Sequence, residues 1–209
     1  MTAIDARRAV LDRIRDALAD RPEPVAVPRD YERSLPAGAD LIALFCERVD
    51  DYRATVRRMT ASDLPGALAA TLAERSAGRV AIPEGVPLEW LATAACERVG
   101  DVPVRSHAEL DALDGTVTSC AVAIAETGTI ILDGGPGQGR RALSLLPDLH
   151  VCVVRADQIV GTVPEALARL DPRRPQTWIS GPSATSDIEL QRVEGVHGPR
   201  QLVVLIVEP

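Results

Sequence analysis

Residues 62–83 read SDLPGALAATLAERSAGRVAIP, and they contain a helix signal followed directly by a strand signal. The stretch opens with a serine and an aspartate, which cap helices, and its first proline suits the first helical turn. Gly78 is typical of a helix end, and residues 79–82 form a short apolar run that Pro83 ends. A helix that leads at once into a strand is the repeating unit of α/β proteins, so this stretch predicts that fold class.

The same alternation continues towards the C-terminus. Leu88, Leu91, Ala95 and Val99 recur at helical spacing and predict another helix. Helices that alternate with short apolar strands favour a mainly parallel sheet with helices on both faces. Further strands are predicted at residues 102–104, 117–125, 129–132, 150–154, 177–179 and 202–207, and further helices at residues 107–113 and 164–170.

The N-terminal residues carry a separate helix signal. Ile4, Leu11, Ile14 and Leu18 lie on one face of a predicted amphipathic helix, and charged residues fill the positions between them. Such a helix docks either on its own domain or on a partner, and both interpretations stay open.

A proline-rich connector follows this helix. Residues 20–40 hold four prolines and little periodicity, which predicts an extended segment. Apolar residues at helical spacing then predict a second, longer helix at residues 41–59. We divide the chain into an N-terminal helix and proline-rich arm, residues 1–50, and a main domain, residues 51–209.

The composition describes a globular protein and excludes several classes of function. Of the 209 residues, 46% are hydrophobic and 25% are charged, so the chain is able to build a substantial core. The net charge of −7 and the absence of a basic run argue against a nucleic-acid partner. All 23 basic residues are arginine, so the chain has no lysine for a P-loop, a Schiff base or a pyridoxal-phosphate anchor.

The four cysteines are scattered through apolar stretches and form no Cys-x-x-Cys pair. We predict buried free thiols in a reduced compartment, with no zinc site and no iron–sulfur cluster in this chain. No group of His, Cys and carboxylate residues has metal-ligand spacing, so no metal is expected. The N-terminus lacks the apolar stretch of a signal peptide, and no apolar run reaches membrane-spanning length. These features predict a cytoplasmic protein without a membrane span.

Residues 178–199 combine the end of a strand with a loop rich in glycine and hydroxyl groups. Hydroxyls are adaptable donors, glycines let backbone N–H groups approach a ligand, and a helix that opens near Ser186 adds a site for an anion. The alternative is an ordinary helix cap between ordinary turns. The residues predicted to bind a ligand here are Gly181, Ser183, Thr185, Asp187, Glu189, Gly195 and Gly198.

Histidine is the usual proton carrier near neutral pH, and the chain has three. His197 lies between glycines in the polar loop, and we predict that it is catalytic. His150 begins an apolar strand and is predicted to be structural. His107 lies at a helix start and is predicted to be exposed.

Glu126, Thr127 and Gly128 interrupt two apolar runs. A carboxylate at a strand end beside a glycine serves as a general base, a nucleophile or a hydrogen-bond acceptor. The alternative is a turn that joins two strands and exposes Glu126.

Residues 133–141, DGGPGQGRR, place four glycines before Arg140 and Arg141. This composition resembles a phosphate cradle in which one of the two arginines neutralises an anion. The spacing matches neither a P-loop nor a dinucleotide fingerprint, and the alternative is a flexible surface loop.

Three motifs occur in order: AETGT at residues 125–129, GPSATSDIE at residues 181–189 and GVHGPR at residues 195–200. Together they resemble the lactate-utilisation protein C family, whose module is the LUD domain, and the resemblance covers residues 56–208. It implies a three-layer α/β/α sandwich like that of sugar-phosphate isomerases and CoA transferases. In that fold the loop at Glu126 faces the active site.

The resemblance also implies a part in oxidising L-lactate to pyruvate beside two iron–sulfur partner proteins. We therefore expect an accessory or regulatory subunit with an anion-binding pocket, no cofactor in this chain, and the clusters on the partners. The alternative is a stand-alone enzyme or sensor for a small carboxylate, a nucleotide or a CoA ester. In that scheme Glu126 is base or nucleophile, His197 moves a proton, and Thr127, Gly128 and Arg140 help to bind the ligand. A structural module without a ligand is the third interpretation.

Overall fold

The computed structural model describes residues 3–20, 25–186, 192–194 and 198–209. The chain divides into two units, Met1–Glu32 and Arg33–Pro209. The first unit contains α1 (Ala3–Ala17), which is the amphipathic helix predicted at the N-terminus. The second unit holds every other helix and strand of the described residues.

The second unit is built on a six-stranded sheet in which each neighbouring pair of strands is parallel. The predicted α/β fold with a mainly parallel sheet is therefore confirmed. Two interior strands of this sheet, Leu149–Arg155 and Gln201–Glu208, carry long buried and mainly apolar runs, as parallel strands buried on both faces do. In spatial order the strands are β1 (Thr55–Thr60), β12 (Gln201–Glu208), β7 (Leu149–Arg155), β4 (Gly115–Thr118), β2 (Arg79–Ala81) and β3 (Glu97–Val99).

Alternate side chains of these strands point to opposite faces of the sheet. On β7, Val151 and Val153 pack in the cluster that includes α3 (Leu64–Glu74) and the 3-10 turn η1 (Leu88–Leu91). Cys152 and Val154 pack on the other side, in the cluster that includes Phe45 and Val49 of α2 (Leu41–Asp51). The core therefore lies on both faces of the sheet.

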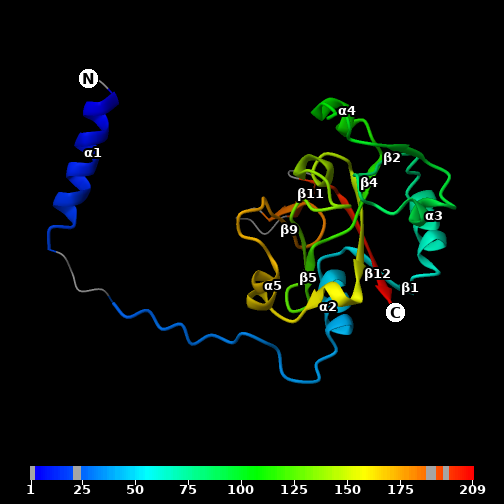
Figure 1. Cartoon of the computed structure of the whole chain (residues 1–209), viewed down its shortest axis with the longest axis horizontal. Helices are drawn as coiled ribbons and strands as arrows, with labels where there is room; N and C mark the ends of the chain where they lie inside the picture. Colours follow the sequence, from blue (N-terminus) through cyan, green and yellow to red (C-terminus); the bar gives the residue numbers. More distant parts are fainter. Residues whose placement is uncertain (1–2, 21–24, 187–191, 195–197) are drawn as a thin grey trace. The chain divides into compact units, whose positions relative to one another are not determined.

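The layer that contains α2 also holds a second sheet of four strands. This sheet contributes to the α2 cluster from one face, and its other face packs against Ala166 of α5 (Val163–Arg169). In Figure 1, α3 and α5 lie on opposite sides of the unit. In spatial order the strands are β8 (Ile159–Val160), β5 (Val122–Ile124), β6 (Thr129–Leu132) and β9 (Thr177–Ile179).

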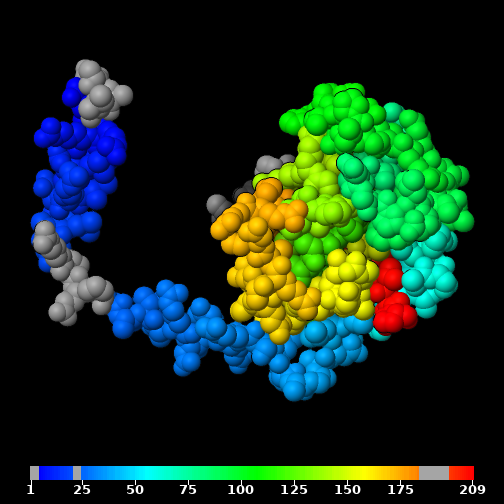
Figure 2. All heavy atoms as spheres, in the orientation of Figure 1, coloured from blue at the N-terminus to red at the C-terminus, as the bar shows by residue number. Residues whose placement is uncertain are grey.

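Short elements complete the chain, and the C-terminal residues lie at the surface beside the segment that holds β1 (Figure 2). None of the described helices is both long and apolar enough to cross a bilayer. The short elements are α4 (His107–Asp111), η2 (Arg141–Ser144), η3 (Ala156–Gln158), and the antiparallel pair β10 (Ala184–Ser186) and β11 (Arg192–Glu194).

The second predicted helix is too long, because α2 ends at Asp51 and Arg53 takes a φ of +63°. Val56 and Met59 instead lie in β1, where Met59 pairs with Val207 of β12. Their side chains enter opposite core clusters, which is the period of a strand. Pairing with a long apolar strand overrides the local helical spacing.

Two further predictions near the sheet edge are wrong. Val99 belongs to β3 and pairs with Ala81, so the helical turn that starts at Leu88 ends at Leu91. Residues 102–104 form no strand; Val102 and Val104 are exposed at a cis Val102–Pro103 bond. Residues 117–125 form two strands, β4 and β5, that belong to different sheets.

Candidate functional site

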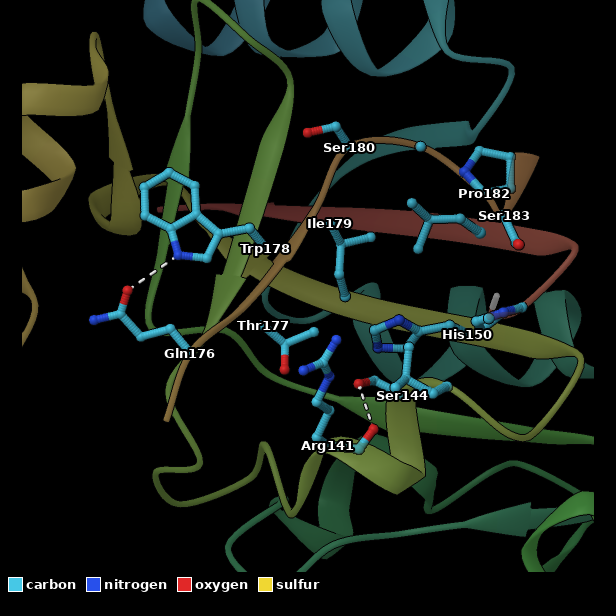
Figure 3. A pocket seen from close by; sticks show the side chains of 15 residues that line it. Arg141, Ser144, His150, Gln176, Thr177, Trp178, Ile179, Ser180, Pro182 and Ser183 are labelled. Atoms are coloured by element: carbon cyan, nitrogen blue, oxygen red, sulfur yellow. Dashed lines mark hydrogen bonds between the residues drawn. The ribbon is translucent and has the colours of Figure 1, made fainter. Parts of the chain in front are cut away.

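A cavity of about 320 Å³ lies where β7 and β12 begin. Its walls are the start of these two strands, the turn η2, strand β9 and the loop of residues 180–183 that follows β9 (Figure 3). Small-molecule sites fall in a range of roughly 300–1,000 Å³, so this cavity suits a small ligand. Its position is the amino edge of the parallel sheet, whereas open α/β sheets usually bind ligands at the carboxyl edge.

The loop of residues 180–183 is held in place from two sides. Gly181 has a φ of +82°, and a Cβ atom there would lie 2.6 Å from the Cβ of Tyr52. The N–H of Ser183 donates to the carbonyl of Pro199 at 2.8 Å. Ser180 Oγ lies 2.8 Å from Thr129 Oγ1 of β6. The close approach to Tyr52 explains why this position is glycine.

His150 forms part of the cavity wall, and its ring lies between β9 and the segment that carries Arg141 and Ser144 (Figure 3). The residue is 1% exposed, and its Nε2 lies 2.8 Å from Thr118 Oγ1 of β4. Its Nδ1 is buried without a hydrogen-bond partner among the described residues. Burial lowers the pKa of His150 to about 4, so the ring is neutral at physiological pH.

Arg141 supplies positive charge at the cavity. Its side chain is exposed, and its guanidinium makes no hydrogen bond or ion pair with another described residue. Ser144 Oγ donates to the carbonyl of Arg141 at 3.1 Å, and this hydrogen bond fixes the turn η2, which carries Arg141. No described carboxylate lines the cavity. With His150 neutral, the described lining has a net positive charge, which favours an anion.

Three predicted ligand-binding residues, Gly181, Ser183 and Gly198, line this cavity together. Thr185 lies on β10. Asp187, Glu189, Gly195 and His197 lie outside the described residues.

Glu126, Thr127 and Gly128 form the turn between β5 and β6, and they are not among the residues that line the cavity. The Glu126 side chain is exposed, and the backbone N–H of Glu126 donates to the carbonyl of Gly161 at 3.0 Å. Gly128 has a φ of +59° and approaches the backbone of Arg48. The turn still reaches the cavity wall through hydroxyls, because Thr129 Oγ1 lies 2.7 Å from Thr127 Oγ1 and 2.8 Å from Ser180 Oγ.

Arg140 lies beside a different cavity, of about 730 Å³, near the carboxyl ends of β2 and β3. Its Nε and Nη2 donate to both oxygens of Asp101 at 2.6 and 3.1 Å, and Nη2 also donates to the carbonyl of Arg105. Hydrogen bonds from Arg140 hold the pKa of Asp101 below its usual range. This guanidinium therefore already neutralises a carboxylate of the chain.

The glycine-rich loop before Arg140 is bound to the rest of the protein. Gly137 N–H donates to the carbonyl of Glu84 at 2.8 Å, and Gly135 N–H donates to Asp133 at 3.0 Å. A phosphate cradle uses such N–H groups for its ligand, and here both are engaged by protein oxygens.

The cysteines are free thiols; Cys120 and Cys152 are buried, whereas Cys46 and Cys96 are partly buried. A hydrogen bond with Cys152, together with burial, raises the pKa of Cys120 well above its usual value. Within the described part of the chain, no group of three His, Cys, Asp or Glu residues is arranged to hold a metal ion.

Sequence reasoning did not place His150 at a cavity, and it considered both Arg140 and Arg141 as the arginine that neutralises an anion before it named Arg140 for ligand binding. The strand pattern around His150 gives no sign that its ring reaches a cavity, since a satisfied core histidine has the same surroundings in sequence. Arg140 and Arg141 are adjacent and of one type. Only the fold shows that the guanidinium of Arg140 is paired with Asp101 and that the guanidinium of Arg141 is unpaired among the described residues.

The parallel sheet, the second, mixed sheet and the cationic cavity together define a mixed α/β protein with a candidate site for a small anion. The LUD domain model matches residues 89–207. A protein of Deinococcus radiodurans named Lactate utilization protein C is 50% identical, over 97% of this chain and 96% of its own length. The chain belongs to the LUD domain family.

Other relatives extend this comparison. Lactate utilization protein C of Halalkalibacterium halodurans is 26% identical over 93% of this chain and 90% of its own length. The crystal structure of a DUF162 family protein from Deinococcus radiodurans matches with a TM-score of 0.69 at 47% identity. That match covers 80% of this chain and 96% of the other, and it agrees with the α/β fold described above.

Proposed function

We propose that this protein is a component of a cytoplasmic system for L-lactate utilisation and that its cavity binds a small carboxylate. The names of the full-length relatives support the pathway. The observation that carries the ligand class is the unpaired Arg141 guanidinium beside a cavity whose described lining contains no carboxylate. An unpaired cation at a partly enclosed site attracts an anion more strongly than one in open solvent.

The role that we propose is that of an accessory or regulatory subunit beside two iron–sulfur proteins that carry out the oxidation. The exposed apolar side chains of α1 and the turn that follows it, Val10, Ile14 and Leu18, support a docking role for this segment. Stand-alone action on a small carboxylate is the second candidate, and the neutral His150 in the cavity wall favours it. The two candidates differ in whether the isolated chain turns over a ligand.

The assembly is tested by anaerobic affinity purification of the tagged, full-length protein from its own host grown on lactate. We expect brown, iron-bearing partners and lactate-dependent dye reduction in the eluate. A variant with Val10, Ile14 and Leu18 changed to Ser removes three exposed apolar side chains of this segment while keeping its charges, and it should lose the partners. A colourless, solitary protein from repeated low-salt preparations would argue against stable assembly.

The ligand site is tested by titrating the purified protein with L-lactate, pyruvate and acetate in a calorimeter. Arg141→Gln removes the charge at the cavity, and Arg173→Gln is the matched control because Arg173 is exposed and outside the lining. We expect at least a tenfold loss of carboxylate affinity in the first variant, about 1.4 kcal/mol, and none in the second. Equal affinity in both variants would exclude Arg141 as the anion contact.

A further inference from the structure

The starting point is the Nδ1 atom of His150. Among the described residues, it is the one buried side-chain nitrogen or oxygen atom without a hydrogen-bond partner. Buried polar atoms are nearly always paired, and leaving one unpaired destabilises the fold. His150 also contributes to the cavity wall, so the unpaired nitrogen belongs to a residue that a ligand in the cavity would meet.

The other ring nitrogen is fixed. Nε2 lies 2.8 Å from Thr118 Oγ1, and both residues are buried. A threonine hydroxyl both donates and accepts, and a neutral imidazole carries its proton on either nitrogen. If Thr118 donates to Nε2, then Nδ1 carries the proton and is a donor. If Nε2 donates to Thr118, then Nδ1 is an acceptor.

We propose that the cavity binds a small carboxylate that carries a hydroxyl or carbonyl oxygen on the adjacent carbon. Arg141 contacts the carboxylate, and Nδ1 of His150 bonds the second oxygen. This inference rests on the carboxylate site proposed above and adds the class of carboxylate that it selects.

The Thr118–His150 pair explains why both oxidation states fit one site. The hydroxyl of a 2-hydroxy acid donates a hydrogen bond to Nδ1 when the ring proton is on Nε2, and the carbonyl oxygen of a 2-oxo acid accepts one when the ring proton is on Nδ1. Reversal of the Thr118 hydrogen bond interconverts the two arrangements without charging the ring. An unsubstituted carboxylate leaves Nδ1 unpaired, and a site with an unpaired buried polar atom discriminates strongly against such a ligand.

The test compares L-lactate, pyruvate and propionate, which differ at carbon 2, as ligands of the full-length protein at pH 7.5. We expect lactate and pyruvate to bind at least tenfold more tightly than propionate. In His150→Phe, which keeps a ring of similar size, this preference should disappear while propionate affinity stays unchanged. The ligand comparison on the unmodified protein tests the proposal even if that variant does not fold.

A second readout follows the ring itself. The chain has three histidines, so ¹⁵N spectra assign His150 by comparison with His150→Phe. Lactate and pyruvate should each shift the Nδ1 resonance, since each brings an oxygen into hydrogen-bond contact with Nδ1, and propionate should leave it unchanged.

The outcomes separate the two proposals. If no carboxylate binds, or if Arg141→Gln binds all three ligands as well as the unmodified protein, the carboxylate site itself is wrong. If all three bind equally in an Arg141-dependent manner, the site stands and the role of His150 is wrong. A preference for the 2-oxygen that survives His150→Phe also overturns the role of His150.

Discussion

The imidazole of His150 on β7 and the hydroxyl of Thr118 on β4 lie 2.8 Å apart, between two strands that pair directly. This contact holds a neutral histidine in a buried position with its second nitrogen unpaired among the described residues. The arrangement has consequences for stability as well as for binding.

The first prediction concerns acid stability. His150 titrates near 6.5 in an unfolded chain and at about 4 in the folded protein, because burial disfavours its charged form. Between these pH values the unfolded state binds a proton that the folded state does not. The contribution of neutral His150 to the free energy of unfolding is therefore fully present above pH 6.5 and is lost as the pH falls towards 4. It amounts to about 3 kcal/mol in the free energy of unfolding.

The measurement is urea denaturation from pH 4 to pH 8. His150→Phe removes the titration, so its free energy of unfolding should fall less with acid than that of the unmodified protein over this range. Every carboxylate and the other two histidines are common to both proteins, so their effects cancel in the difference. Parallel curves would show that His150 is not held neutral by burial.

The second prediction concerns Gly128, which the sequence analysis assigned to ligand binding. A Cβ atom at this position would lie 2.8 Å from the carbonyl carbon of Arg48, and φ is +59°. We therefore expect Gly128→Ala to lower the free energy of unfolding by about 1–3 kcal/mol. Gly66 of α3 is the matched control, since a Cβ atom there would have no neighbour within 4 Å, and its change to Ala should stabilise by up to about 1 kcal/mol. Equal effects on thermal unfolding would contradict the steric explanation.

The third prediction concerns Arg140. Its hydrogen bonds to Asp101 and to the carbonyl of Arg105 are partly buried, so Arg140→Ala should cost about 1–2 kcal/mol of stability. Arg79→Ala breaks an exposed pair with Glu97 and should cost less than about 1 kcal/mol. Chemical denaturation gives both values. Carboxylate affinity should stay unchanged in Arg140→Ala, and a selective loss of affinity there would restore Arg140 to the ligand site.

Much of the fold follows from sequence because local signals and packing agree. The helix–strand unit at residues 62–82 appears as α3 and β2. The aliphatic run near the C-terminus appears as an interior parallel strand. The errors lie where packing opposes local spacing: Val56, Met59 and Val99 have helical spacing, yet each pairs in the sheet. An isolated periodicity does not report which neighbour a residue meets.

The candidate site was harder to predict for a physical reason. Gly181, Ser183 and Gly198 are recognisable as loop residues from their types, and the structure places them at one cavity. The interest of His150 and Arg141 depends on tertiary contacts instead. His150 stands out because its Nδ1 has no hydrogen-bond partner, and Arg141 stands out because its guanidinium has no ion-pair partner among the described residues. Neither property is visible in the residue type.

The fourth prediction uses Trp178 as a reporter. This residue lines the cavity, is 41% exposed, and donates from Nε1 to Gln176 Oε1 at 3.0 Å (Figure 3). A bound carboxylate should cover part of the indole and reduce its quenching by acrylamide. The chain has two tryptophans, so Trp90→Phe isolates the Trp178 signal.

The protection should persist in Trp90→Phe and vanish in Trp178→Phe, and its concentration dependence should match the calorimetric affinity. Trp90 packs against the cluster on the other face of the parallel sheet, away from the α2 layer. A ligand that protects Trp90 instead would therefore bind elsewhere. Protection of neither residue, at ligand concentrations that saturate the calorimetric signal, would place the bound carboxylate outside this cavity.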